Sequence, residues 1–354
     1  MGKINPRPEI ARLRAYEAPE PTASVILAAN ENPDNLPAPV LEEIREIAAS
    51  TAFNRYPDAR VLELRKALAR QNGVEVENVI VGNGGDEILV QVCLAFGGMQ
   101  RASLTFPPTF SMYEIISVST GTAVVSVPRR ADFSVDEEEA LRAAAGADLV
   151  FLSNPNNPTG NLEGVEAVER LASATKGLFV LDEAYHEFAG VTYLDLIDEL
   201  ENLLVLRTFS KAFSMAGLRV GYLIARPEVI AELQKVRLPY NANAFSQAAA
   251  LAALKYRPLF EERIRTIVAE RERVREALGE VRGVEVLPSR ANFLLLRLDG
   301  IDAFELWREL LERDVLVRNF AGDERLERCL RVTIGSRAEN DAFLAALGEA
   351  IQED

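Results

Sequence analysis

The sequence predicts an α/β protein with a large, mostly parallel sheet flanked by helices, and a second, smaller α+β domain. The first observation is that apolar, β-branched runs alternate with amphipathic helical patterns between residues 79 and 224, which is typical of a sheet with helices on both faces. The second is that the pattern stays helical from residue 244 to about 278 and then changes to short mixed elements. The third is the length of 354 residues, which is long for one domain and comfortable for two.

The expected elements follow in chain order after an irregular, proline-rich segment that ends near residue 35. Apolar runs predict strands at residues 79–81, 101–105, 123–127, 148–153, 178–181, 203–207 and 220–224. Amphipathic patterns between them predict helices that include residues 86–96, 109–118, 136–144 and 163–174. The long helical stretch is interrupted near Pro258, and the smaller domain contains GVEVLPS, ANFLLLRL, a helix around 304–312, DVLVR, CLRVTIG and a final helix.

Composition and charge argue against several classes of protein. The 54 acidic residues exceed the 39 basic ones by 15, so the field of the whole protein would repel nucleic acid and anionic membranes. No apolar run reaches the roughly 20 residues of a membrane span, and the N-terminal stretch is too polar for a secretory signal, so we expect a cytoplasmic protein. A single histidine argues against a histidine-rich metal site, and Cys93 and Cys329 are expected to be buried thiols. We therefore expect no nucleic-acid partner, no membrane partner and no metal.

Ligands of an open α/β sheet bind at the loops that follow the carboxyl ends of the strands, so these loops are the candidate site. In VGNGGDE at 81–87, the glycines let backbone N–H groups approach an anion at the N-terminus of the next helix. The loop lacks the third glycine of a dinucleotide fingerprint, since Glu87 stands there, and it does not match a Walker loop. Taken alone, it is explained equally well as a tight turn and helix cap.

Two further loops carry polar side chains. SNPNNPTGN at 153–161 contains two Asn-Pro steps, which predict an extended loop with its side-chain amides directed outward, although a plain turn also explains it. LDEAYHEF at 181–188 ends an apolar strand with Asp182, whose burial would be costly unless a cation lies opposite. Taken alone, Asp182 is more simply an ordinary acid on a surface loop.

The loop RTFSKAFSMAGLRVGY at 207–222 places Lys211 between two apolar runs, which indicates that this lysine is held inside the protein. Arg219 lies eight residues further along the chain. A phosphate cradle, an amide donor, a buried acid and a lysine with a nearby arginine are together what a pyridine aldehyde phosphate requires. The four loops therefore point to this cofactor class jointly.

With these loops the chain resembles the fold type I pyridoxal-phosphate aminotransferases, and among them the histidinol-phosphate aminotransferases. The matching stretches span nearly the whole chain and are LAANENP, NRYPD, GNGGDE, PPTFSMY, NPNNPTG, DEAYHEF, RTFSKAF, AGLRVGY, LVRNF and CLRVTIG. The resemblance implies an aspartate-aminotransferase-like fold. It also implies a division into an N-terminal arm at 1–35 that contributes to the small domain and covers the active site, a cofactor-binding domain at 36–250, and a linking helix with the small domain at 251–354.

The resemblance further implies catalytic roles toward pyridoxal 5'-phosphate. Lys211 would bind the cofactor's aldehyde and then serve as base and acid, which requires its pKa to be lowered by Arg219 and by removal from water. Asp182 would pair with the protonated pyridine nitrogen. Asn157 and Tyr185 would hold the phenolic oxygen of the ring, and Asn157 would also contact substrate.

The implied phosphate ligands are helix-end N–H groups, hydroxyls and one arginine, a set that suits a dianion. They are the backbone amides of Gly85 and Asp86 and the side chains of Thr208, Ser210 and Arg219. Phe110 matches the residue that stacks on the cofactor ring, a position where the family more often has tyrosine. Stacking tolerates this change, whereas a hydroxyl contact would be lost.

The implied substrate residues lie toward the two ends of the chain. Arg331 matches the anchor for a substrate carboxylate or phosphate, and Arg318 matches a second anion contact, although each alone could be a surface arginine that flanks a strand. Tyr16 and Asn32 lie in the N-terminal region and are candidates for recognition of an imidazole. Tyr56 matches a residue that the neighbouring subunit donates, which implies a homodimer.

The resemblance thus implies an aminotransferase that exchanges an amino group between histidinol phosphate and 2-oxoglutarate, giving imidazole acetol phosphate and glutamate, in histidine biosynthesis. An aromatic amino acid aminotransferase or a threonine-phosphate decarboxylase of the same family are the alternatives that keep the cofactor. A non-enzymatic alternative is the ligand-binding domain of a regulator, which the acidic charge disfavours.

Overall fold

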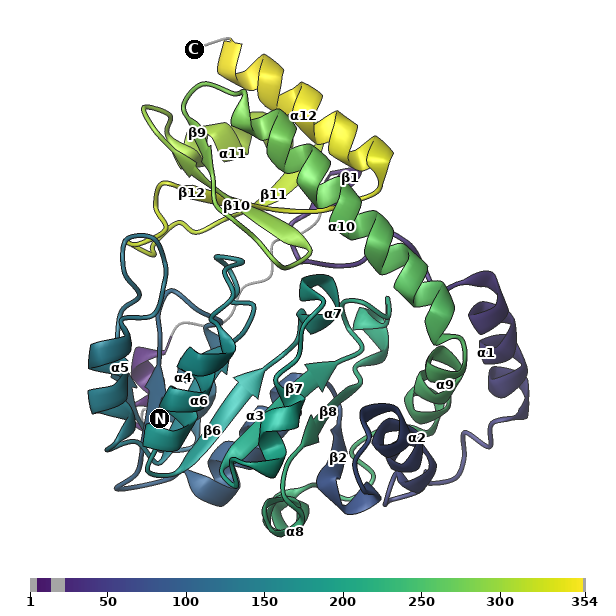
Figure 1. Ribbon diagram of the computed structural model, residues 1–354. Coiled ribbons are helices and arrows are strands. Elements are labelled where there is room, and N and C mark those ends of the chain that lie inside the picture. Colours follow the sequence, from purple (N-terminus) through teal and green to yellow (C-terminus); the bar gives the residue numbers. More distant parts are fainter. Residues whose placement is uncertain (1–4, 14–22, 353–354) are drawn as a thin grey trace.

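The computed structural model describes residues 5–13 and 23–352, and this part of the chain folds around two sheets (Figure 1). In the large, seven-stranded sheet, β8 runs antiparallel to both of its neighbours and the other neighbouring strands are parallel. In spatial order its strands are β2 (Val79–Gly82), β8 (Gly221–Ile224), β7 (Leu203–Thr208), β6 (Leu178–Asp182), β5 (Leu149–Ser153), β3 (Ala102–Thr105) and β4 (Ala123–Ser126).

Side chains alternate along these strands between two hydrophobic cores, one on each face of the sheet. Val79 and Val81 belong to one core, whereas Ile80 between them belongs to the other. The helices that cover the Ile80 side are α3 (Gly85–Phe96), α4 (Met112–Ser119) and α8 (Pro227–Val236). Those on the opposite side include α2 (Leu62–Asn72), α5 (Glu137–Ala144), α6 (Val165–Ala174), α7 (His186–Ala189) and α9 (Ala244–Lys255), with α1 (Ala38–Ser50) packed on α9.

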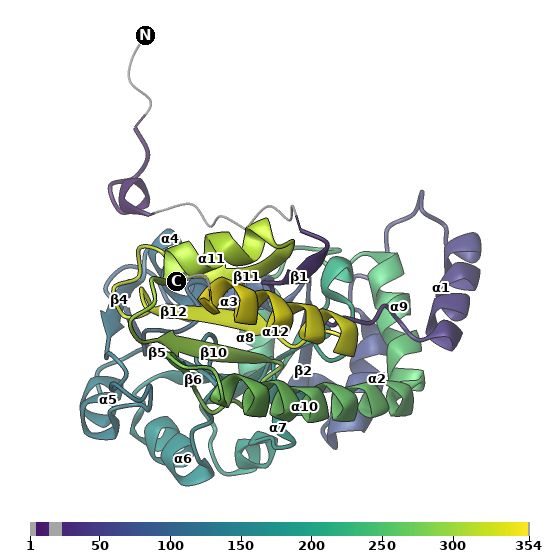
Figure 2. The same cartoon turned by 90° about the horizontal axis from the view of Figure 1, so that it is seen from above.

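The smaller, five-stranded sheet is mainly antiparallel. Its strands are, in order, β1 (Val25–Leu27), β11 (Val315–Asn319), β12 (Cys329–Thr333), β10 (Phe293–Leu298) and β9 (Val284–Val286), and only the β1–β11 pair is parallel. Seen from above in Figure 2, its helices lie over one face. They are α10 (Arg257–Gly279), α11 (Ala303–Glu312) and α12 (Arg337–Gln352). Short 3₁₀ helices lie at Ile10–Arg12, Val76–Asn78, Leu194–Asp198 and Ala216–Leu218.

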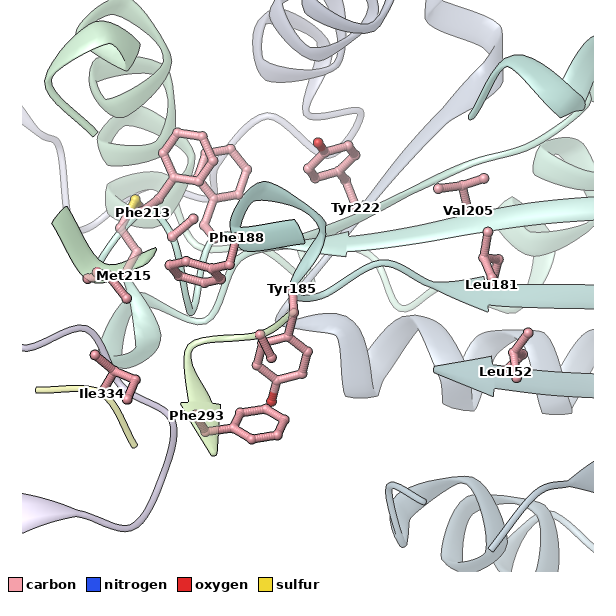
Figure 3. Packing of buried hydrophobic residues seen from close by; sticks show 14 of the residues in the cluster. Leu152, Leu181, Tyr185, Phe188, Val205, Phe213, Met215, Tyr222, Phe293 and Ile334 are labelled. Atoms are coloured by element: carbon pink, nitrogen blue, oxygen red, sulfur yellow. The ribbon is translucent and has the colours of Figure 1, made fainter. Parts of the chain in front are cut away.

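One hydrophobic core joins the two sheets. It contains Leu152, Leu181 and Val205 of the large sheet together with Phe293 of β10 (Figure 3). Tyr185 and Phe293 meet edge to face, with ring centroids 5.2 Å apart and an interplanar angle of 86°. The small sheet is therefore held next to the loop that follows β6.

The expected architecture and elements are confirmed, with different end residues. The helix expected from residue 109 begins at Met112. The segment expected to be irregular contains β1, because its three apolar residues pair with β11 from the distant end of the chain. Helices α1 and α2 are additional to the expected elements. The division of the chain at residues 35 and 250 stays a prediction.

Both cysteines are free, buried thiols, as expected. Among the described residues, no helix is both long enough and apolar enough to cross a bilayer.

Candidate active site

The predicted loops converge because neighbouring parallel strands end at the same edge of the large sheet. Ser153 at the end of β5 lies opposite Asp182 at the end of β6, and Asp182 lies opposite Leu206 of β7. Asp182 is the last residue of β6, and the loops after β5 and β7 carry Asn157 and Lys211 respectively. The site thus lies outside the carboxyl ends of the strands, where this class of sheet binds ligands.

Lys211 is half-buried, and its Nζ donates a hydrogen bond of 3.0 Å to the carbonyl of Ala29. The pKa of Lys211 is lowered to about 8, mainly by burial and then by the cations of Arg331 and Arg219, while Glu31 opposes them. The lysine is therefore partly buried, whereas the sequence predicted that it is held inside the protein, and Arg331 contributes more than Arg219 to the lowered pKa. At neutral pH a useful fraction of this amine is neutral.

Asp182 is 6% exposed, and both of its oxygens accept hydrogen bonds. The Tyr113 hydroxyl donates to Oδ2 at 2.7 Å, and the backbone N–H of Ala184 donates to Oδ1 at 3.0 Å. Burial raises the pKa of Asp182 to about 6 despite these two bonds. The cation expected opposite Asp182 is replaced by two neutral donors, so a cationic ring nitrogen placed beside the carboxylate would lower its pKa and favour its charged form.

Arg331 joins the small sheet to the loop after β5. Its Nη1 donates to Oδ1 of Asn157, and its Nη2 donates to the Ala28 carbonyl at 2.7 Å. The guanidinium is 5.3 Å from the ring centroid of Phe293 and 6.0 Å from that of Phe320. Arg331 is itself 7% exposed, so it is a buried cation fixed by carbonyl oxygens and aromatic faces.

Asn30 connects Tyr185 to the small sheet. Its Nδ2 donates to the Tyr185 hydroxyl at 3.0 Å, while its backbone N–H donates to Oγ1 of Thr333 at 2.9 Å and its carbonyl accepts from Asn292 at 3.1 Å. Asn30 is buried and has a φ of 53°, a left-handed conformation that asparagine tolerates better than most residues. The N-terminal segment is thereby tied to both sheets beside Lys211.

The amides of the SNPNNPTGN loop were expected to point outward, and for two of them this is wrong. Asn154 donates to the Glu163 carbonyl at 3.2 Å and accepts from the Glu163 N–H at 2.8 Å. Asn156 donates to the Pro108 carbonyl at 3.0 Å and accepts from the Thr109 hydroxyl at 2.8 Å. Both side chains are buried because they satisfy the polar groups of a loop that packs against the protein.

An anion cradle surrounds the N-terminus of α3. Gly84 has a φ of 83°, and a Cβ there would lie 2.5 Å from Nη2 of Arg219. A Cβ at Gly221 would lie 2.5 Å from the Gly85 nitrogen. The glycines therefore allow Arg219 and the end of α3 to come close together.

The donor set of this cradle fits a phosphate group. Ser210 accepts from Thr208 at 2.9 Å and from Arg219 at 3.3 Å, so both hydroxyls and the guanidinium share one small region. The first N–H groups of a helix have no acceptor within the helix and favour anions. Arg219 also pairs with the Asp86 carboxylate at 3.1 Å, with both side chains partly exposed. A dianion bound here would compete with that carboxylate for the guanidinium.

The remaining candidates lie as follows. Asn32 donates to the Lys211 carbonyl at 3.4 Å, Phe110 packs edge-on against Tyr113, and Arg318 lies directly opposite Arg331 across β11 and β12. Tyr56 is 81% exposed and stacks on Tyr240, with ring centroids 4.4 Å apart. Tyr16 lies outside the described residues. Gly85 and Asp86 begin α3 at the cradle.

Two residues of the site were not among the sequence-predicted ones, namely Tyr113 and Asn30. Both stand in stretches that carry the resemblance, PPTFSMY and LAANENP. Tyr113 also reads as an apolar residue of the α4 pattern, and its polar contact becomes visible only when α4 packs over β6. The left-handed turn at Asn30 likewise depends on partners that are distant in sequence.

The chain belongs to the class I and II aminotransferases, since the model of that family matches residues 22–347. It is 45% identical over 343 residues to the histidinol-phosphate aminotransferase of Thermococcus kodakarensis, covering 97% of each chain. The crystal structure of histidinol-phosphate aminotransferase from Sinorhizobium meliloti in complex with pyridoxal-5'-phosphate superposes with a TM-score of 0.89 at 29% identity, covering 98% of this chain and 97% of that one. The L-threonine-O-3-phosphate decarboxylase of Porphyromonas gingivalis gives a TM-score of 0.82 at 29% identity, covering 93% of this chain and 100% of that one.

Proposed function

We propose that this chain is a pyridoxal-phosphate-dependent aminotransferase that converts histidinol phosphate and 2-oxoglutarate to imidazole acetol phosphate and glutamate, a step of histidine biosynthesis. The observation that carries the proposal is the meeting of Lys211, Asp182 and the Arg331–Asn157 pair at one edge of the large sheet, next to an anion cradle. Its likeness to histidinol-phosphate aminotransferases along nearly the whole chain supports the choice of substrate.

Lys211 is the group that moves the proton. Bound pyridoxal phosphate supplies an aldehyde for the substrate amine and an electron-withdrawing ring. With a pKa of about 8, the Nζ of Lys211 can take a proton from the substrate carbon near neutral pH and return it elsewhere, which an ordinary lysine with a pKa above 10 would rarely do. Asp182 would place a negative charge beside the ring nitrogen of the bound cofactor and keep that nitrogen protonated.

The other cofactor contacts fix its position. The cradle at the start of α3 binds the phosphate through the N–H groups of Gly85 and Asp86, the hydroxyls of Thr208 and Ser210, and Arg219. Phe110 would stack on the ring, and Tyr185 and Asn157 would hold its phenolic oxygen. Substitution of the cradle side chains should therefore raise the Kd for the cofactor more than it slows the chemical step.

Arg331 and Arg318 bind the anionic end of the substrates. One pocket must accept a carboxylate from glutamate and a phosphate from histidinol phosphate, and two arginines on adjacent strands offer donors to both. Asn32, beside Lys211, and Tyr16 are the candidates for contact with the imidazole.

The protein acts in the cytoplasm as a homodimer in which Tyr56 reaches the partner's active site. Tyr56 and the exposed residues Phe53, Leu238 and Tyr240 form an apolar surface that a second copy would cover. Mixing the inactive variants Lys211→Ala and Tyr56→Ala tests this arrangement. Mixed dimers contain one site with both wild-type residues, so activity should reappear on mixing, and its absence would count against the shared site.

The substrate is tested by steady-state assay of the purified protein with histidinol phosphate, phenylalanine and threonine phosphate. We expect kcat/KM to be highest for histidinol phosphate with 2-oxoglutarate as acceptor. The likeness to threonine-phosphate decarboxylase makes that activity the main rival. Release of carbon dioxide from threonine phosphate without a need for 2-oxoglutarate would identify it, and a preference for phenylalanine would indicate an aromatic aminotransferase.

A further inference from the structure

We infer that Tyr113 is a positioning residue that holds the Asp182 carboxylate charged and correctly directed toward the cofactor's ring nitrogen. This inference rests on the proposed function, because it concerns the acid that faces the pyridine ring. Tyr113 touches Asp182 rather than the reacting atoms, so its effect on the reaction passes through that carboxylate.

The two hydrogen bonds to Asp182 come from different directions. Tyr113 reaches Oδ2 from α4, whereas the Ala184 N–H reaches Oδ1 from the loop that follows β6. Two donors on different oxygens fix the plane of a carboxylate as well as its position. The backbone bond is local to the loop, so the Tyr113 bond is the one that ties Asp182 to a separate element.

The ring of Tyr113 has little freedom to move. It is 1% exposed, stacks on Phe151 of β5 with centroids 5.3 Å apart and planes at 7°, and meets Phe110 edge-on at 5.5 Å and 86°. Phe110 is the residue proposed to stack on the cofactor. Tyr113 therefore joins the stacking residue and the acid in one rigid unit.

The charges around Asp182 make this donor necessary. Asp86 and Glu183 are like charges that raise the pKa of Asp182, burial raises it more, and the hydrogen bonds from Tyr113 and Ala184 lower it. Tyr185 and the buried Arg129 also interact electrostatically with Tyr113. Without that hydroxyl the pKa of Asp182 would rise further, and a smaller fraction would be charged at neutral pH.

The test compares Tyr113→Phe with Tyr193→Phe. Tyr193 is also buried, and its hydroxyl donates a bond of the same 2.7 Å length to the Glu163 carbonyl, which is not part of the proposed cofactor site. The measured quantity is the Kd of cofactor-free protein for pyridoxal phosphate between about pH 5 and 8, where the pKa of Asp182 lies.

For Tyr113→Phe we expect binding to weaken about twofold at pH 7 and nearly tenfold at pH 5, because losing a hydrogen bond to a charged group should raise the pKa of Asp182 from about 6 by about one unit. The pH below which the Kd for pyridoxal phosphate begins to rise, called here the acidic limb of the binding curve, should increase by about one unit. Tyr193→Phe should follow the wild-type curve. Asp182→Asn should lack this limb, and adding Tyr113→Phe to it should change nothing more.

A Tyr113→Phe curve that coincides with the wild-type and Tyr193→Phe curves would overturn the inference. A further tenfold loss in the double variant would also overturn it, because Tyr113 would then act on something other than Asp182. Tyr113→Leu is the second variant if the phenylalanine variant does not fold.

If the wild-type protein neither binds pyridoxal phosphate nor acts on histidinol phosphate, the proposed function fails, and cofactor-free protein still tests the role of Tyr113. An acid with a raised pKa in the folded state makes the free energy of unfolding fall as pH rises toward that pKa. The fall attributable to Asp182 should extend to higher pH in Tyr113→Phe than in Tyr193→Phe. Equal pH dependence in these two variants would count against the inference.

Discussion

The cradle at the start of α3 and the arginine pair on the small sheet both place positive charge near Lys211, but they are built differently. The cradle combines helix-end N–H groups and two hydroxyls with Arg219, whose side chain is 42% exposed and already paired with Asp86. The arginine pair contains Arg331, which is buried against Phe293 and bound by carbonyl oxygens.

The difference teaches which region controls the lysine and which region holds a ligand. An exposed cation that is paired with a carboxylate and screened by water exerts a weak field, whereas a buried cation acts through a medium of lower dielectric constant. In agreement, Arg331 lowers the pKa of Lys211 more than Arg219 does. The cradle is therefore suited to binding an anionic ligand. The small sheet, through Arg331, lowers the pKa of Lys211 at the edge of the large sheet.

The strongest change removes the amine on which both regions act. Lys211→Ala should lower turnover by about 10⁴-fold, near the upper end for loss of a general acid–base group, and should abolish the yellow absorbance of cofactor bound to the lysine. Lys235→Ala is the control, since that lysine is exposed on α8 and paired with Glu232. Borohydride reduction followed by peptide mapping that located the cofactor on another lysine would refute the assignment.

Asp182→Asn tests the acid that lies between the two regions. We expect cofactor to remain bound while turnover falls by about 10²-fold or more, because an amide cannot keep the ring nitrogen protonated. Absorbance gives the bound cofactor and single-turnover kinetics give the chemical step. Near-normal turnover in a variant with cofactor bound would contradict this role.

Within the arginine pair, the two members should differ. Arg331→Ala should impair both half-reactions by about 2 kcal/mol or more, as expected when one side of a buried charge pair is lost. Arg318→Ala should raise KM for histidinol phosphate more than KM for glutamate, because a phosphate carries more charge than a carboxylate. Equal losses for both substrates in Arg318→Ala would mean that this arginine has a structural role.

The smallest expected effect compares the two regions directly through the pKa of Lys211. Removing a nearby cation raises the pKa of an amine, so Arg331→Gln should raise it more than Arg219→Gln, by about one unit or less. This pKa can be measured by treating cofactor-free protein with a reagent that reacts with amines. The rate at which Lys211 is labelled is then followed as a function of pH. A larger shift in Arg219→Gln would reverse the comparison drawn above.

The pH dependence of protein stability gives a second measure of the pKa of Lys211. Its pKa is lower folded than unfolded, so the unfolded chain binds more protons and stability should rise as pH increases from about 8 to the ordinary lysine value near 10.4. Lys211→Met should lack this rise in cofactor-free protein. Thermal unfolding across this pH range provides the measurement.

Much of the large sheet could be predicted because its information is local. Strands such as β5 and β7 are continuous apolar runs between turn residues, so their sequence alone places them to within one residue at each end. The convergence of Asp182 and Lys211 then follows from the rule that parallel strands end at one edge. These residues were predicted for physical reasons as well as by resemblance.

The parts that could not be predicted depend on contacts between distant segments. Asn154 and Asn156 are polar residues in a turn-like sequence, and nothing local shows that the loop folds inward and buries them. The larger influence of Arg331 on Lys211 requires β12 to lie over the large sheet, a packing that spans 120 residues of sequence. Hydrogen bonds such as that of Tyr113 to Asp182 are likewise a property of the assembled fold.

The left-handed turn at Asn30 has a consequence for hydrogen exchange. Its N–H can exchange with solvent only after its 2.9 Å bond to Thr333 breaks, and both this bond and strand β1 just before Asn30 belong to the small sheet. Only the Asn30 side chain reaches Tyr185, in the loop that follows β6 of the large sheet. Slow deuterium uptake by this amide both with and without substrate would mean that residues 28–30 move together with the small sheet, and that any opening breaks the side-chain bond to Tyr185 instead.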